Sequence, residues 1–249
     1  MRAGGVCWFD SANPPRPGHA SHACTEQPSR RRPSADTVNG PHQDQPLLTA
    51  GTDLERASAA VVAVHGRGAS ARSVLQLTGP VSHPGVALLA PQAAGNAWYA
   101  GSSLAPVEST EPGRTSGLQA IADAVGLANA AGVPTERVAV FGFSQGACLV
   151  CEFAARIPTR YGGIVALSGG LLGETVDSGD YEGDLAGTPA FLGCGDADHS
   201  LPPARVRETA VALEGLDADV TSRVYDGLGH AVNDDELVRV SGIVAGLLP

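Results

Sequence analysis

Lysine is absent from this chain of 249 residues. Its 16 basic residues are all arginine, and they are outnumbered by 26 acidic residues. The formal charge of −10 provides no broad basic surface, so we expect neither nucleic acid nor an anionic membrane as a partner. No apolar run reaches the roughly 18 residues that a membrane-spanning helix needs. The five cysteines are an odd number and cannot all pair within the chain. We therefore expect a cytoplasmic protein without a membrane span.

The first forty residues differ in composition from the rest. Residues 1–40 are rich in Pro, Ser and His and show no apolar periodicity, which predicts a disordered N-terminal extension. Their cysteines and histidines match no standard zinc spacing, so we predict no metal site. Residues 41–249 are long enough for one α/β domain with a substantial core.

Short apolar runs alternate with helix-compatible segments along residues 41–249. This alternation predicts an α/β fold, with a mostly parallel central sheet and helices on both faces. The expected strands are 59–64, 86–90, 137–142, 163–168, 189–194 and 220–225, with residues 45–49 as an added edge strand. The expected helices are 70–78, 115–131, 145–156, 204–215 and 234–248.

The most informative motif is Gly-Phe-Ser-Gln-Gly at residues 142–146. It follows an apolar, β-branched run and precedes a helix-compatible segment, so it reads as strand, sharp turn and helix with Ser144 at the apex. Such a turn holds the serine hydroxyl clear of its neighbours, and flanking glycines avoid a steric clash. Ser144 is therefore a candidate nucleophile, although a plain turn between strand and helix remains the alternative.

A serine nucleophile needs a general base that is oriented by a carboxylate. Downstream of Ser144 the histidines are His199 and His230, and His230 lies in a glycine-rich loop after an expected strand. Asp196 and Asp198 follow another strand and are both candidate acids. Since parallel strands place their C-terminal ends at one edge, serine, acid and His230 are expected to meet there. His199 lies too close to these acids in sequence and is expected to be a solvated loop residue.

Two backbone amides are expected to bind the oxyanion of the tetrahedral intermediate. One belongs to Gln145, the residue after the nucleophile. The other belongs to Arg67, within the sequence His65-Gly-Arg-Gly68 that follows the expected strand 59–64. A glycine loop that binds phosphate is the alternative for this segment, but neither standard phosphate-loop pattern occurs.

Cys148 and Cys151 lie three residues apart on the helix expected behind Ser144. We interpret them as packed core thiols. A redox Cys-x-x-Cys motif is the alternative, but such a motif usually opens its helix.

These motifs resemble the phospholipase/carboxylesterase family of α/β-hydrolases, which includes carboxylesterases and acyl-protein thioesterases and is related to dienelactone hydrolases. The resemblance covers roughly residues 41–249. It rests on His65-Gly-Arg-Gly68, Ala90-Pro91, Trp98-Tyr99, Gly142-Phe-Ser-Gln-Gly146, Gly195-Asp-Ala-Asp198 and Gly229-His230.

The resemblance implies that Asp198, the second aspartate of its motif, is the acid. Many relatives carry a hydrophobic residue where Arg67 stands, but the expected donor is the backbone amide, which survives the change. Dienelactone hydrolases use a cysteine nucleophile, so Ser144 argues against their chemistry.

The sequence thus predicts a serine carboxylesterase with the triad Ser144, Asp198 and His230, acting without cofactor or metal on a small-molecule ester or thioester. A lysophospholipase or acyl-protein thioesterase is the alternative, and an inactive hydrolase scaffold that binds a ligand is the non-enzyme alternative. Trp98 and Tyr99 are candidates to line the substrate pocket, with core packing as the competing role for Trp98. The Arg67 side chain is a candidate to pair with an anionic substrate group. Both a monomer and a homodimer agree with the sequence.

Overall fold

The computed structural model describes residues 40–249 of the chain. The predicted N-terminal extension lies outside the described residues except for Gly40. Its disorder, and the boundary between extension and domain, therefore remain predictions.

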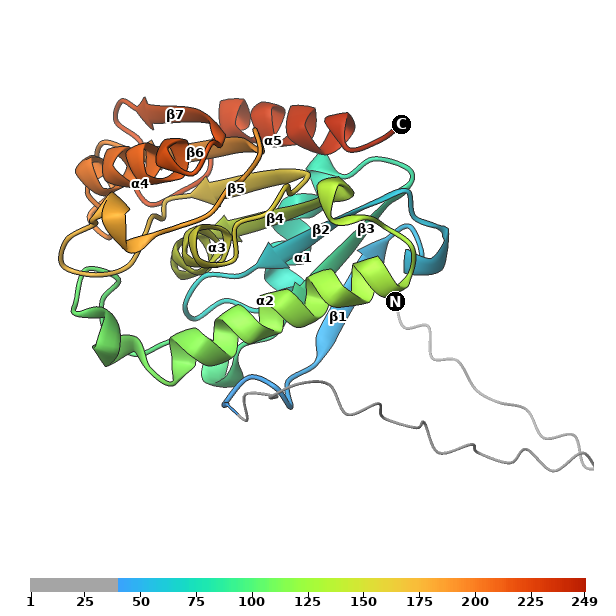
Figure 1. Cartoon of the computed structure of the whole chain (residues 1–249), viewed down its shortest axis with the longest axis horizontal. Coiled ribbons are helices and arrows are strands. Elements are labelled where there is room, and N and C mark those ends of the chain that lie inside the picture. The colour runs from blue at the N-terminus through green and yellow to red at the C-terminus, as the bar shows by residue number, and fades with distance from the viewer. Residues whose placement is uncertain (1–39) are drawn as a thin grey trace, which may run out of the picture. The chain divides into compact units, whose positions relative to one another are not determined.

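A seven-stranded sheet forms the centre of the described residues (Figure 1). Its spatial order is β1-β3-β2-β4-β5-β6-β7, in which β1 runs antiparallel to β3 and all other neighbouring pairs are parallel. The strands are β1 Leu47–Gly51, β2 Ala59–Val64, β3 Val86–Pro91, β4 Val138–Phe143, β5 Gly163–Leu167, β6 Pro189–Gly195 and β7 Asp219–Tyr225.

The α-helices of residues 40–249 cover both faces of this sheet. Helices α1 (Ala71–Thr78) and α5 (Asp234–Gly246) pack on one face. Helices α2 (Gly113–Ala130), α3 (Gln145–Arg156) and α4 (Pro203–Gly215) pack on the other. The predicted α/β fold with a mostly parallel, doubly covered sheet is confirmed.

Burial explains why the inner strands read as continuous apolar runs. Every residue of β2 and of β3 is buried, because both faces of these strands lie under helices. Strand β7 lies at the edge, and most of its residues are exposed, so its sequence is correspondingly polar. The predicted edge strand at 45–49 appears as β1, shifted by two residues to Leu47–Gly51.

The strand register brings six loops to one edge of the sheet. Val64 of β2 pairs with Gly142 of β4, and Gly142 pairs with Ala166 of β5. Because β2 to β7 are all parallel, the loops after β2, β3, β4, β5, β6 and β7 emerge at their shared C-terminal edge. The candidate site is built from these loops.

The helix boundaries follow local capping signals. Ser70 accepts a hydrogen bond from the Ser73 amide at the start of α1, and Asn233 accepts one from the Glu236 amide at the start of α5. Helix α2 begins at Gly113, two residues before the predicted start, and α5 ends at Gly246, two residues before the predicted end.

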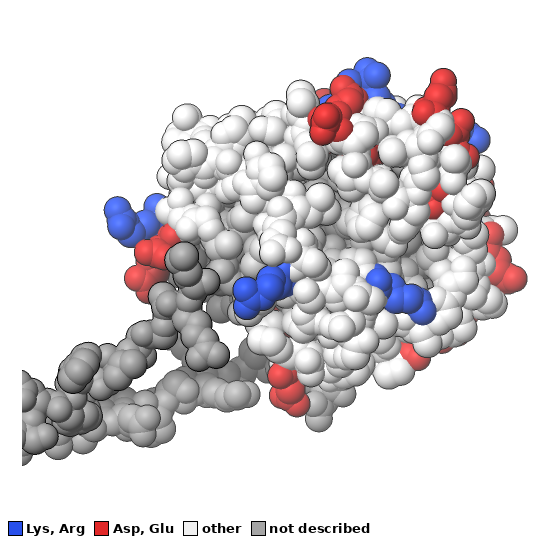
Figure 2. Space-filling view, turned by 180° about the vertical axis from the view of Figure 1, so that it is seen from behind, with Lys and Arg blue, Asp and Glu red and all other residues white. Residues whose placement is uncertain are grey.

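None of the helices in residues 40–249 combines the length and the hydropathy that a membrane crossing requires. On the face shown in Figure 2, charged side chains stand singly or in small groups around a wide uncharged area. This face carries no continuous basic patch of the kind that binds nucleic acid.

Candidate active site

Ser144 occupies a strained turn between β4 and α3. Its backbone has φ 57° and ψ −124°, a left-handed conformation that non-glycine residues rarely adopt. A side chain on Gly142 would overlap the backbone of Gly146, and one on Gly146 would overlap the carbonyl oxygen of Val64. The two glycines therefore allow the strand and the helix to approach closely enough to form the turn.

The structure brings Ser144, His230 and Asp198 together in one hydrogen-bonded chain. His230 Nε2 lies 2.8 Å from Ser144 Oγ, and His230 Nδ1 lies 2.8 Å from Asp198 Oδ2. The Phe143 ring packs against the His230 ring, with 5.1 Å between the ring centroids. This geometry allows the imidazole to accept the serine proton while the carboxylate orients the ring.

The Asp198 carboxylate is fully buried, whereas the side chain of His230 is 30% exposed. Burial by itself raises the pKa of Asp198, but hydrogen bonds from His230 and from the Ser200 amide outweigh it and hold the pKa below its usual range. Asp198 is thus kept ionised next to the imidazole.

The alternative candidates for the acid and the base, Asp196 and His199, lie outside this hydrogen-bonded chain. Asp196 is exposed and accepts a hydrogen bond from the Gly227 amide, so it braces the turn before His230. His199 is exposed on the loop after β6 and makes no side-chain hydrogen bond within residues 40–249. The structure therefore assembles Asp198 and His230 with Ser144, but neither Asp196 nor His199.

Two amides near Ser144 remain free to donate hydrogen bonds. The Gly68 and Ala69 amides donate to the carbonyl oxygens of Asn96 and Gly66, whereas the preceding Arg67 amide has no acceptor in the described part of the chain. The amide of Gln145, the first residue of α3, is likewise unbonded there. The positive end of the α3 dipole adds to the stabilisation of negative charge at this point.

The side chain of Gln145 fixes the loop after β3, a role that sequence reasoning missed. Its Oε1 accepts from the Trp98 amide at 2.8 Å, and its Nε2 donates to the Tyr99 carbonyl at 2.9 Å. The sequence analysis assigned only the backbone amide of Gln145. The signal that could have found the second role is the amide side chain itself, directly after the nucleophile and facing a loop with unpaired backbone groups.

Two buried histidines also hold this region together and were not singled out from the sequence. His65 Nε2 accepts from the Ala93 amide, and His42 Nε2 lies 2.8 Å from the Trp98 carbonyl. Burial lowers the pKa of both imidazoles below the ordinary value of 6.5. Both imidazoles are therefore uncharged at pH 7, and they link neighbouring loops through hydrogen bonds.

Trp98 requires a correction to the expected pocket lining. Its side chain is fully buried and donates from Nε1 to the His65 carbonyl at 2.8 Å. It therefore packs behind the loop that carries the Arg67 amide and does not line the cavity, because its indole N–H needs a buried acceptor. Tyr99 and Arg67, the other two candidates, do lie at the cavity wall.

The cavity above Ser144 has a volume of about 320 Å³. Its wall contains Arg67, Tyr99, Gly101, Ser102, Ser103, Ser144, Gln145, Cys148, Ser168, Ser200, Leu201 and His230.

Cys148 and Cys151 are buried and not bonded to each other. Burial raises the pKa of both thiols, which keeps them protonated and unreactive. The expected role as packed core thiols fits this environment, and the redox alternative does not.

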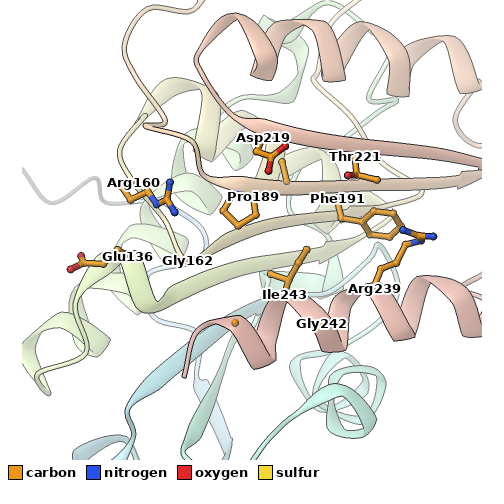
Figure 3. Close-up of a pocket in the computed structure, with 12 residues that line it drawn as sticks. Glu136, Arg160, Gly162, Pro189, Phe191, Asp219, Thr221, Arg239, Gly242 and Ile243 are labelled. Carbon is orange, nitrogen blue, oxygen red and sulfur yellow. The ribbon is translucent and has the colours of Figure 1, made fainter. Parts of the chain in front are cut away.

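A second cavity, of about 490 Å³, lies at the opposite edge of the sheet (Figure 3). Pro189 and Asp219, the first residues of β6 and β7, line it together with Arg160, Arg239 and Ile243. It contains no serine, cysteine or histidine in its wall. Although larger, it therefore lacks the serine and histidine pair that the cavity above Ser144 contains.

Comparison with known proteins shows which family the chain is similar to in sequence and in fold. The family model for phospholipase/carboxylesterase matches residues 52–245. A solved structure described as a phospholipase/carboxylesterase from Dyadobacter fermentans superimposes with a TM-score of 0.77 at 38% sequence identity, over 81% of this chain and 96% of that one.

Curated relatives match a shorter stretch. Acyl-protein thioesterase 1 of Gibberella zeae is 31% identical over 123 residues, and lysophospholipase-like protein 1 of Mus musculus is 29% identical over 119 residues. The alignments span 47% of this chain in each case and about half the length of these relatives, 51% and 50%. The family match covers most of the chain, and this protein therefore belongs to the phospholipase/carboxylesterase family of α/β-hydrolases.

Proposed function

We propose that this protein is a serine hydrolase that cleaves carboxylic esters of small molecules through an acyl-enzyme. The observation that carries the proposal is the continuous hydrogen-bonded chain from Ser144 through His230 to Asp198, next to two free amides. Membership of a family of ester hydrolases supports it.

The reaction begins when His230 Nε2 takes the Ser144 proton and Ser144 Oγ attacks the ester carbonyl. The resulting oxyanion accepts hydrogen bonds from the Arg67 and Gln145 amides. His230 then donates its proton to the leaving alcohol, which departs and leaves the acyl group on Ser144. A water molecule, deprotonated by His230, attacks the acyl-enzyme, and the acid is released as the proton returns to Ser144.

Asp198 acts on the imidazole rather than on the substrate. It accepts the Nδ1 proton, which leaves Nε2 free as the base, and it stabilises the imidazolium that forms in each step. The reaction needs neither a cofactor nor a metal, since acyl transfer is carried entirely by these side chains and amides.

A fluorophosphonate probe tests the proposal directly, because it forms a covalent bond only with an activated serine. We expect stoichiometric labelling of the native protein at Ser144, no labelling of Ser144→Ala, and loss of p-nitrophenyl butanoate hydrolysis in that variant. An unlabelled native protein that hydrolyses no ester would instead support the alternative of an inactive scaffold that binds a ligand.

Thioester or lysophospholipid hydrolysis is the second candidate function, because relatives carry the names acyl-protein thioesterase and lysophospholipase-like protein. The same triad would act on either bond. A panel of oxygen esters, thioesters and lysophospholipids of equal acyl length distinguishes the candidates by the ratio of their kcat/KM values.

We also infer that the chain acts in the cytoplasm, since Cys148, Cys151 and Cys194 are buried free thiols. Both a monomer and a homodimer remain predictions. Light scattering on the purified full chain distinguishes them.

A further inference from the structure

The cavity above Ser144 has an unusually polar wall for a site that would receive an aliphatic acyl chain. Apart from the nucleophile, the serines Ser102, Ser103, Ser168 and Ser200 line it, and Leu201 is its sole aliphatic side chain. The hydroxyl of Ser168 is buried near the Asp198 carboxylate, whose pKa it helps to lower. An apolar chain in this cavity would strip water from the accessible hydroxyls of Ser102, Ser103 and Ser200 without replacing their hydrogen bonds, which is costly.

The guanidinium of Arg67 is fixed at the wall of this cavity and its charge is not neutralised. It donates to the carbonyl oxygens of Tyr99, at 3.1 Å, and of Gly101. No carboxylate lies within salt-bridge distance of it in residues 40–249, and no acidic side chain lines the cavity. Two neutral carbonyls thus hold a full positive charge in position for an anionic partner.

An apolar groove of about 220 Å³ lies on the other side of the nucleophile turn. The wall of this groove includes Phe143, Val74 and Leu77. Gly66 also lines the groove and lies next to the nucleophile, since a Cβ added to Gly66 would lie 3.2 Å from the Ser144 Cβ. The Phe143 ring contacts His230, the group that must protonate the leaving alcohol. The apolar groove thus reaches His230 through the Phe143 ring, whereas the polar cavity, which His230 itself lines, holds Arg67 and the serines.

We propose that this enzyme is selective for esters whose short acyl group carries a carboxylate, which pairs with Arg67, while an apolar alcohol leaves past Phe143. The inference rests on the ester hydrolysis proposed above and defines its substrate class. The half-ester of a short dicarboxylic acid is the simplest such compound. The serine hydroxyls of the cavity then donate to the carboxylate oxygens that Arg67 leaves unpaired.

The net charge of the chain makes a local cation necessary for such a substrate. At a formal charge of −10 the protein as a whole repels an anion. Attraction must therefore come from short-range contact with Arg67, the one arginine in the wall of this cavity.

Three esters test the proposal when acid release is followed by pH-stat titration. Methyl butanoate has a neutral acyl group, monomethyl succinate has a carboxylate on a four-carbon acyl group, and O-butanoylglycolate has its carboxylate on the alcohol. We expect the native protein to prefer monomethyl succinate. We expect Arg67→Gln to lower the ratio of kcat/KM for monomethyl succinate over methyl butanoate by about 10- to 100-fold, the range of a hydrogen-bonded charge pair.

Two further variants make the comparison specific. Arg67→Lys keeps the charge and should restore part of the ratio. Arg56→Gln removes the same charge from an exposed arginine before β2, at the opposite edge of the sheet, and should leave the ratio unchanged.

A binding measurement decides the matter if methyl esters react slowly. Succinate should slow fluorophosphonate labelling of Ser144 more than butanoate does, and Arg67→Gln should remove this difference. Ester cleavage with an unchanged ratio in Arg67→Gln, equal protection by both acids, or a preference for O-butanoylglycolate would each overturn the substrate class and leave the hydrolase function standing. A Ser144 that neither reacts with the probe nor cleaves any ester would instead overturn the hydrolase function.

Discussion

Two cavities lie at opposite edges of the same sheet, and the smaller one carries the chemistry. The cavity at the C-terminal edge, about 320 Å³, contains a strained serine, a half-buried histidine and, nearby, two free amides. The groove at the N-terminal edge, about 490 Å³, has arginines, acids, Thr221 and apolar side chains in its wall, but no serine, cysteine or histidine (Figure 3). Volume therefore does not locate the site, whereas convergent donors and a nucleophile do.

The glycines of the two regions show the same difference. At the nucleophile turn, side chains on Gly142 or Gly146 would overlap backbone atoms of neighbouring segments. At the groove, Gly242 and Gly246 of α5 have open space where a Cβ would lie. Glycine is thus required by geometry at Gly142 and Gly146, but not at these two positions of α5.

Asp198→Asn should show the largest effect. It replaces the acceptor of the His230 Nδ1 proton and favours the wrong tautomer, so we expect kcat to fall by about 10³- to 10⁴-fold with little change in fold. Asp196→Asn is the matched control two residues away and should change kcat less than about 3-fold, because Asn keeps the oxygen that accepts from Gly227. Steady-state hydrolysis of p-nitrophenyl butanoate measures both. Equal losses in the two variants would contradict the assignment of the acid.

Gly146→Ala should show the next largest effect, on stability. The added methyl group would overlap the Val64 carbonyl, and the turn cannot relax without separating α3 from β2. We expect the free energy of unfolding to drop by about 3 kcal/mol or more. Urea unfolding followed by circular dichroism measures it. A stability within about 0.5 kcal/mol of the native protein would refute the close packing of the nucleophile turn.

Acidification should weaken the loops that support the site. The pKa values of His42 and His65 lie below 6.5 in the folded protein, so near and below this pH the unfolded chain binds more protons. Their contribution to stability is therefore complete above about pH 6.5 and is lost as the pH falls through the folded values. The urea midpoint at a series of pH values measures this loss.

His42→Gln provides the comparison for the pH series. Glutamine can accept from the Ala94 amide and donate to the Trp98 carbonyl, as His42 does, without titrating. The variant should flatten the pH dependence, whereas the exposed control His199→Gln should not. An unchanged curve for His42→Gln would show that this histidine does not couple pH to stability.

Gly242→Ala should show the smallest effect and the opposite sign. Open space surrounds the position, and alanine favours the helix over glycine. We expect the free energy of unfolding to rise by about 0.5 to 1 kcal/mol, with kcat/KM unchanged. Thermal unfolding and ester hydrolysis measure the two quantities. A loss of activity in Gly242→Ala would mean that the groove at the N-terminal edge influences the site.

The nucleophile turn shows what local sequence can predict. Apolar strands, helix caps and the Gly-Phe-Ser-Gln-Gly motif are local signals, so the strands and helices were predicted to within a few residues. The region of Trp98 shows the limit. From the sequence, a tryptophan in a loop at this edge of the sheet is consistent with a pocket wall and equally with the core. The structure distinguishes the two, because the Trp98 indole donates to a buried acceptor, the His65 carbonyl.

The sequence by itself determined the α/β fold and indicated Ser144 and His230, with Asp196 and Asp198 both open as the acid, because alternating apolar runs and short motifs depend on neighbours along the chain. Only the tertiary structure decided the rest. It placed Asp196 on a turn and Asp198 beneath His230, joined His42 and Gln145 to the loop after β3, and left the charge of Arg67 without a partner. These outcomes depend on contacts between residues that lie 30 to 60 positions apart, roughly, and loop packing rather than local pattern selects such contacts.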